Sequence, residues 1–130
     1  MKFYTFVLVA CAFIATTKCL LATDREDKMK IHNVCVAETG VSQEFIDKMI
    51  AGEFCDDTNF KNYLVCFLKN DGVFLDNGEL KADGANRQIR EFADDEDTVS
   101  GFMANCAVQM ATVEESAFHY SKCMYNTLYG

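Results

Sequence analysis

The sequence contains no proline, and no stretch of it alternates between apolar and polar residues over the length of a strand. Proline breaks the interior of a helix, and regular alternation is the mark of a half-buried strand. The first absence leaves helices uninterrupted, and the second removes the usual signal for a sheet. Both absences favour an all-helical fold.

The sequence also lacks an apolar run long enough to cross a membrane. The longest run, Phe6 to Ala15, falls well short of the roughly 20 residues that a transmembrane helix needs. Lys2 precedes this run and small or apolar residues lead to Ala22, which is the pattern of a secretory signal peptide. We therefore expect residues 1–22 to be a cleaved signal, with a cut after Cys19 as the alternative.

The remaining residues, 23–130, are enough for one secreted domain with one core, without stable membrane insertion. Basic residues are scarce, because 12 lysines and arginines stand against 20 acids, giving a formal net charge of −8. Such acidity opposes binding to nucleic acid or to anionic membranes. We interpret the charge as that of a solvated surface that keeps a secreted protein soluble.

Residues that carry chemistry are sparse as well. The two histidines, His32 and His119, are far apart, and no serine, histidine and acid combination forms a recognisable motif. The acids at Asp94 to Asp97 lack the glycine and glutamate of a calcium loop. We therefore expect no enzyme activity, no metal site and no cofactor. Both histidines are interpreted as solvated helix residues rather than pH sensors.

Apolar residues recur at helical spacing in six segments. The first segment begins at Thr23, which can form a capping box with Glu26, and it ends at Gly40. The second runs from an N-cap at Ser42 to Gly52.

The third and central helix follows the acidic turn from Asp56 to Asn59 and ends at Asp71 and Gly72. Its apolar residues cover most of its circumference: Phe60, Tyr63, Leu64, Cys66, Phe67 and Leu68. A helix this apolar needs neighbours on all sides. After it we expect a loop over residues 73–81, with four apolar residues folding back onto the core: Val73, Phe74, Leu75 and Leu80.

Three further helices complete the prediction. A weak helix spans Ala82 to Ala93, with Ile89 and Phe92 on its inner face. The next begins at the four acids at 94–97, which suit a helix amino terminus, and its buried side continues through Val99, Phe102, Met103, Cys106, Met110 and Val113. The last begins almost without a loop at a second capping box, Thr112 with Glu115. The fold class we expect is a compact all-α domain of six helices.

Five cysteines follow the signal segment, which is an odd number for an oxidising compartment: Cys35, Cys55, Cys66, Cys106 and Cys123. Spacing alone does not fix their pairing. The spacing nevertheless resembles that of insect odorant-binding proteins of the pheromone and general odorant-binding type. That family has six cysteines, with three residues between the second and third and eight between the fifth and sixth.

Asn62 and Glu114 stand where this family has its second and fifth cysteines. Those two cysteines pair with each other in the family. Their joint loss therefore resembles the subclass called minus-C, which keeps the other two bridges.

The resemblance implies a bridge from Cys35 to Cys66 and another from Cys106 to Cys123. Each is worth about 3 to 4 kcal/mol in the chain-entropy model. Cys55 is then left as a buried or half-buried thiol, or as the link of a homodimer. A swap that pairs Cys55 internally and frees another cysteine also stays open.

The resemblance further implies a carrier that solubilises a small hydrophobic ligand, such as an odorant, a pheromone or a plant volatile. It places the protein in extracellular fluid, such as sensillum lymph or haemolymph, with a chemosensory receptor as a further partner. The implied cavity is apolar, and eleven phenylalanines and six methionines suit its wall, although ordinary core packing explains any single one of them better. Helical facing and the position of the family's cavity predict this wall: Phe74, Leu80, Ile89, Phe92, Phe102, Met103, Met110, Phe118 and Met124. Hydroxyls that could orient a ligand are offered by Tyr120, Tyr125 and Tyr129.

Two other functions stay open on the sequence. A solid-cored secreted protein could act through its surface on a microbe, a protease or a receptor. A carrier could instead serve lipids or cuticular hydrocarbons outside the sensory system. Displacement of a fluorescent apolar probe by volatiles separates the carrier from the surface-acting protein, and the tissue of expression separates the two kinds of carrier.

Overall fold

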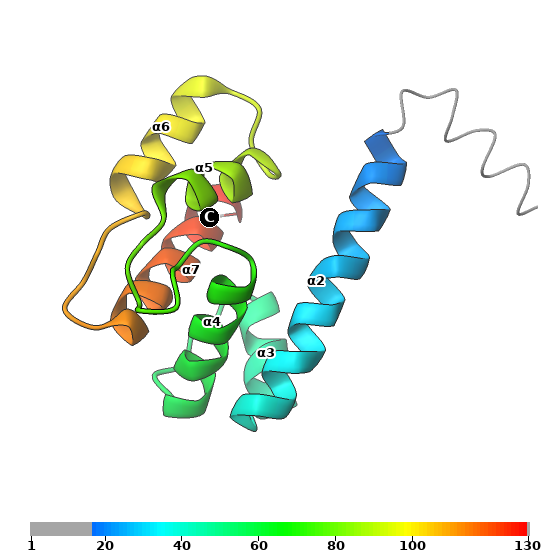
Figure 1. Cartoon of the computed structure of the whole chain (residues 1–130), viewed down its shortest axis with the longest axis vertical. Helices are drawn as coiled ribbons and strands as arrows, with labels where there is room; N and C mark the ends of the chain where they lie inside the picture. Colours follow the sequence, from blue (N-terminus) through cyan, green and yellow to red (C-terminus); the bar gives the residue numbers. More distant parts are fainter. Residues whose placement is uncertain (1–16, 130) are drawn as a thin grey trace, which may run out of the picture.

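The computed structural model describes residues 17–129, which form six helices and no regular strand (Figure 1). The helices are α2 (Thr17–Thr39), α3 (Gln43–Ile50), α4 (Thr58–Asn70), α5 (Ala82–Arg90), α6 (Glu96–Asn105) and α7 (Val113–Tyr129). The predicted all-α class is therefore confirmed. Most of the expected signal peptide lies outside the described residues, so its cleavage stays a prediction.

Side-chain caps fix the start of four helices in the segments that the sequence indicated. The side-chain oxygen accepts a hydrogen bond from a backbone N–H two or three residues further on at Ser42, Asp57, Asp95 and Thr112. Each cap satisfies an N–H group that the first turn of a helix leaves unpaired. At Asp95, hydrogen bonds from the amide and the hydroxyl of Thr98 hold the pKa of the carboxyl below its ordinary value.

The first predicted boundary is wrong for the chain as it stands, because α2 begins at Thr17 and passes through Thr23 without interruption. The expected capping box with Glu26 needs a helix that starts at Thr23. In the full-length chain the preceding residues extend the helix instead.

The boundary between the last two helices also differs from the prediction. The helix that was expected to reach Val113 ends at Asn105, and a loop precedes α7. The cause lies in α7, because His119 Nε2 donates to the carbonyl of Asn105 at 2.9 Å and the amide of Met110 donates to the hydroxyl of Ser116 at 2.8 Å. Backbone groups that would extend α6 are thereby bound by α7 side chains.

The loop after α4 folds back as predicted, except at one residue. Val73 and Phe74 are buried and Leu80 is half-buried, and an isolated antiparallel bridge joins Phe74 to Leu80. Leu75 is exposed, contrary to the prediction. Leu75 begins a turn in which its carbonyl accepts from the amide of Gly78 at 2.9 Å, and turns of this kind lie at the surface.

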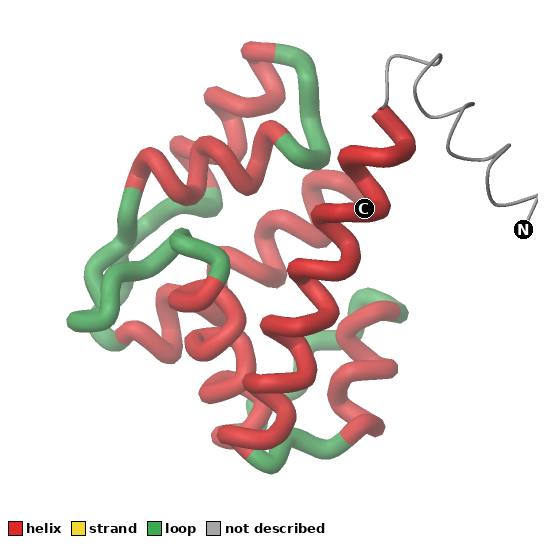
Figure 2. The backbone as a smooth tube through the Cα atoms, turned by 45° about the vertical axis from the view of Figure 1, so that its right-hand side comes forward, coloured by secondary structure: helices red, strands yellow, loops and turns green. Residues whose placement is uncertain are grey.

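The helix α4 occupies the centre of the domain, between α2 on one side and α7 on the other (Figures 1 and 2). Its buried residues Phe60, Leu64 and Leu68 belong to the main core. Helices α5 and α6 pack on each other at one end, around a smaller core centred on Ile89 and Phe102.

Two disulfides connect these helices. Cys35 pairs with Cys66 and joins α2 to α4, and Cys106 pairs with Cys123 and joins the end of α6 to α7. These are the bridges that the family resemblance implied. Cys55 is unpaired and half-buried in the segment before α4.

A close backbone approach fixes α5 against the turn that follows α4. Gly84 is buried in the first turn of α5, and a Cβ added there would stand only 1.7 Å from the carbonyl oxygen of Gly72. No side chain fits this space, so the contact requires glycine. In contrast, a Cβ added at Gly101 in α6 meets no atom within 4 Å.

This difference predicts opposite effects of the same substitution. Gly84→Ala should lower the free energy of unfolding by about 3 kcal/mol or more, because backbone must move to make room. Gly101→Ala should raise it by about 0.5 to 1 kcal/mol, because alanine favours the helix interior. Urea denaturation followed by circular dichroism measures both values. Equal effects of the two substitutions would contradict the packing of α5 described here.

Candidate ligand-binding cavity

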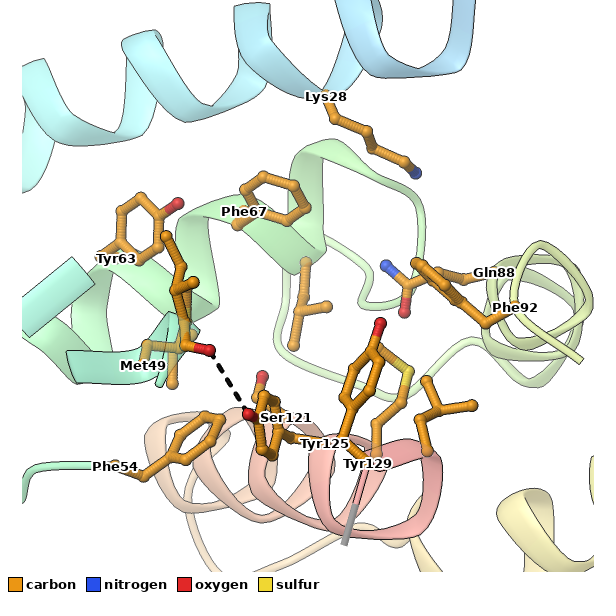
Figure 3. Close-up of a pocket in the computed structure, with 15 residues that line it drawn as sticks. Lys28, Met49, Phe54, Tyr63, Phe67, Gln88, Phe92, Ser121, Tyr125 and Tyr129 are labelled. Carbon is orange, nitrogen blue, oxygen red and sulfur yellow. Dashed lines mark hydrogen bonds between the residues drawn. The ribbon is translucent and has the colours of Figure 1, made fainter. Parts of the chain in front are cut away.

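A cavity of about 600 Å³ lies beside α4, in the space between α2, α3, α5 and α7 (Figure 3). The residues that line it come from these helices and from the segments after α3 and α5: Lys28, Met49, Ile50, Phe54, Tyr63, Leu64, Phe67, Leu68, Gln88, Phe92, Ser121, Met124, Tyr125, Leu128 and Tyr129. Three of them, Ile50, Phe92 and Tyr129, are exposed large apolar residues. The cavity is therefore open to solvent along part of its rim.

Helical periodicity brings the wall residues of α4 and α7 together. On α4 they are two adjacent pairs one turn apart: Tyr63 with Leu64, and Phe67 with Leu68. On α7 they recur every three or four residues: Ser121, Met124, Tyr125, Leu128 and Tyr129. Such spacing places each set on one face of its helix. The two faces lie on opposite sides of the cavity (Figure 3).

Aromatic rings close the side of the cavity next to α3. The ring centres of Phe54 and Tyr125 are 6.0 Å apart, and those of Tyr125 and Tyr129 are 5.0 Å apart. The hydroxyl of Tyr125 donates to the carbonyl of Ile50 at 3.3 Å. This bond joins α7 to the end of α3.

The opposite side of the cavity is polar and centres on the buried carboxylate of Asp71. Lys28 Nζ lies 2.5 Å from Asp71 Oδ1, and the side-chain amide of Gln88 donates to Asp71 Oδ2, also at 2.5 Å. The oxygen of Gln88 accepts from the hydroxyl of Tyr120 at 2.7 Å. Burial and the nearby charge of Asp71 raise the pKa of Tyr120, so this hydroxyl stays a donor.

A second polar contact adjoins the wall at Tyr63. Its hydroxyl lies 2.7 Å from Nδ1 of His32, which projects from α2. Burial raises the pKa of Tyr63 to about 12, so the phenol is neutral at physiological pH. His32 is thus half-buried with a defined partner, and so is His119, which binds the carbonyl of Asn105. The interpretation of both histidines as solvated residues is therefore wrong.

Of the nine residues predicted for the cavity wall, Phe92 and Met124 line this cavity. Phe92 reaches it from beyond the end of α5, because that helix ends at Arg90 rather than at Ala93. Met110 lies in the loop before α7 and is 39% exposed, so it lies outside both the core and the cavity.

The other six predicted residues pack elsewhere. Three belong to the small core of α5 and α6 or pack against it: Ile89, Phe102 and Met103. Three belong to the main core or pack against it: Phe74, Leu80 and Phe118. Which residues contact a ligand stays a prediction. The residues that line the cavity are now the candidates, and they share only Phe92 and Met124 with the predicted set.

Sequence reasoning missed the contribution of α4 and of the segment after α3. It assigned Leu64 and Phe67 to the core, and it gave Phe54 no role. The available signal was the breadth of the apolar surface of α4, because two neighbouring helices do not cover so wide a stripe.

Within residues 17–129, no helix is both long and apolar enough to cross a bilayer. Over the same part of the chain, no three histidine, cysteine, aspartate or glutamate side chains are grouped so that they could hold a metal ion.

Comparison with solved structures supports the fold. The odorant-binding protein dmelOBP28a from Drosophila melanogaster superposes with a TM-score of 0.68 at 17% identity, over 82% of this chain and 93% of that one. The Apis mellifera odorant binding protein 5 gives a TM-score of 0.66 at 22% identity, over 81% and 88% of the two chains.

Comparison of sequences gives the family. The B1 protein of Tenebrio molitor is 25% identical over 117 residues, which are 90% of each chain. The B2 protein of the same beetle is 29% identical over 90 residues, which are 69% of this chain and 70% of that one. The PBP/GOBP family profile matches residues 17–127, nearly the whole of the described chain, and the loss of one cysteine pair is consistent with the minus-C subclass. The protein belongs to the PBP/GOBP family.

Proposed function

We propose that this protein is a secreted carrier that binds a small hydrophobic molecule in its cavity and keeps it dissolved in extracellular fluid. The observation that carries the proposal is a cavity of about 600 Å³ with a mostly apolar wall. Water in such a space makes few hydrogen bonds, so replacing it with an apolar guest is favourable. At roughly 30 Å³ for a water-sized group, the cavity has room for a guest of about ten to twenty non-hydrogen atoms.

The proposed cargo is an odorant, a pheromone or a plant volatile. Support comes from the family and from the two solved neighbours, which are named odorant-binding proteins. The proposed setting is sensillum lymph or haemolymph, with a chemosensory receptor as a further partner. Two disulfides suit an oxidising, extracellular compartment.

The rival function, a protein that acts only through its surface, accounts less well for the interior. A protein that acts only through its surface does not need a cavity beside its central helix. An unfilled apolar space would only lower its stability. Exposed apolar residues at the rim, such as Ile50, are also easier to explain as the entrance for a hydrophobic guest.

A pair of methionine substitutions tests the carrier. Met124 lines the cavity and Met110 lies exposed outside it. Met124→Trp should weaken binding of a fluorescent naphthylamine probe by about tenfold or more, since the indole occupies space that the probe needs. Met110→Trp should leave probe affinity unchanged. Fluorescence titration measures both affinities, and thermal unfolding checks that both variants are folded.

Two results would count against the carrier. One is a wild-type protein that binds no probe, or whose probe no volatile displaces. The other is equal probe affinity in the wild-type protein and in a folded Met124→Trp variant.

The unpaired thiol of Cys55 gives a prediction about assembly. Cys55 is half-buried, and the other four cysteines of residues 23–130 form two disulfides with one another. We expect the mature protein to run as a monomer on a non-reducing gel and to react with a maleimide once per chain. A covalent dimer that Cys55→Ser abolishes would instead support the homodimer.

A further inference from the structure

The polar end of the cavity is electrically balanced. Lys28 lies between two carboxylates, 2.5 Å from Asp71 and 3.2 Å from Glu91. Arg87 binds the other oxygen of Glu91 at 2.7 Å and also donates to the backbone carbonyl of Asp71. Two cations therefore face two anions, and their formal charges cancel.

Two polar side chains at this end line the cavity, and both carry N–H groups. Lys28 and Gln88 are wall residues (Figure 3), whereas Asp71, Arg87 and Glu91 do not line the cavity. An ammonium has three N–H groups and a side-chain amide has two. Asp71 and Glu91 engage two of those on Lys28, and Asp71 engages one on Gln88. One N–H on each residue remains for a ligand.

Three classes of ligand group are expected to bind at this polar end with different affinities. A carboxylate would bring a third anion to within a few Å of Asp71 and Glu91, where no unpaired cation balances it, and nearby like charges repel. A pure hydrocarbon would displace water from the two spare N–H groups and leave them unsatisfied. A neutral carbonyl oxygen accepts from them and adds no charge.

We propose that the cavity selects uncharged ligands that carry a carbonyl oxygen, such as ketones and esters, with Lys28 and Gln88 as the residues that bind the oxygen. This inference rests on the proposed carrier function. The apolar body of the ligand lies along α4 and α7, between Leu64 and Met124.

A matched series of ten-carbon ligands tests the preference in the wild-type protein. Decane, methyl octyl ketone and decanoate share their length, and decanoate is ionised at pH 7.4. Competition with the fluorescent probe should rank the ketone first, with decane and decanoate each bound about tenfold or more weakly. If none of the three competes, the carrier function itself fails. If all three compete equally, or if decanoate competes best, the carrier stands and the selection for a neutral carbonyl is overturned.

A charge substitution tests the cause. Glu91→Gln removes one anion of the cluster and gives the cluster a net charge of +1, without changing any residue that lines the cavity. Affinity for decanoate relative to the ketone should then rise by about tenfold. The matched control is Glu96→Gln, which removes a carboxylate that pairs with Arg90 outside the cavity. Its ligand ranking should equal that of the wild type.

An unchanged decanoate ratio in a folded Glu91→Gln variant overturns the charge-balance argument, as does an equal rise in the control. Lys28→Met gives an independent check, because it removes the cation and its spare donor. It should weaken the preference for the ketone over decane, because only Gln88 then donates to the oxygen, and an unchanged preference in a folded variant contradicts the role of Lys28.

Discussion

The fold depends on the way α4 is held from two sides. On one side a disulfide joins Cys66 of α4 to Cys35 of α2, and on the other α4 packs along α7. Because α2 and α7 both contact α4, they are held apart on its two sides. The face of α4 at Leu64 and Phe67 remains between these neighbours, and the space beside it stays open. The cavity follows from this arrangement rather than from any single small side chain.

A second constraint acts at the polar end of the same space. Burying the carboxylate of Asp71 costs free energy unless its oxygens are bound, and Lys28 and Gln88 bind them. Gln88 in turn holds Tyr120 of α7. One carboxylate therefore ties together α2, the end of α4, α5 and α7, and it sets the chemistry that a ligand meets there. The same side chains that stabilise the fold thus contribute to ligand selection.

Much of the fold could be predicted from the sequence, because its signals are local. The absence of proline and the apolar periodicity gave the helices, and oxygen-bearing side chains such as Ser42 and Asp57 marked their starts. The disulfides followed from a resemblance in cysteine spacing. The predictions failed where distant residues decide the structure, as at the end of α6, where His119 binds the last carbonyl.

The cavity wall was predictable only in part, for a physical reason. Helical facing shows which side of a helix is buried, but not whether that side meets another side chain or empty space. Phe102 and Met124 were both predicted for the wall, yet Phe102 is buried in the small core and only Met124 lines the cavity. The contacts of Lys28 with Asp71 and Glu91 join residues 43 and 63 positions apart, beyond the reach of any local pattern.

The central claim is that a hydrophobic guest lies against α4 inside the domain. The most direct measurement is an isotope-filtered NMR experiment on the protein with specifically labelled methyl groups and a bound unlabelled ketone. We predict nuclear Overhauser effects from the ligand chain to the methyl groups of Leu64, Leu68 and Met124, which line the cavity. Effects confined to methyl groups outside the cavity, such as those of Val108 and Leu75, would contradict it.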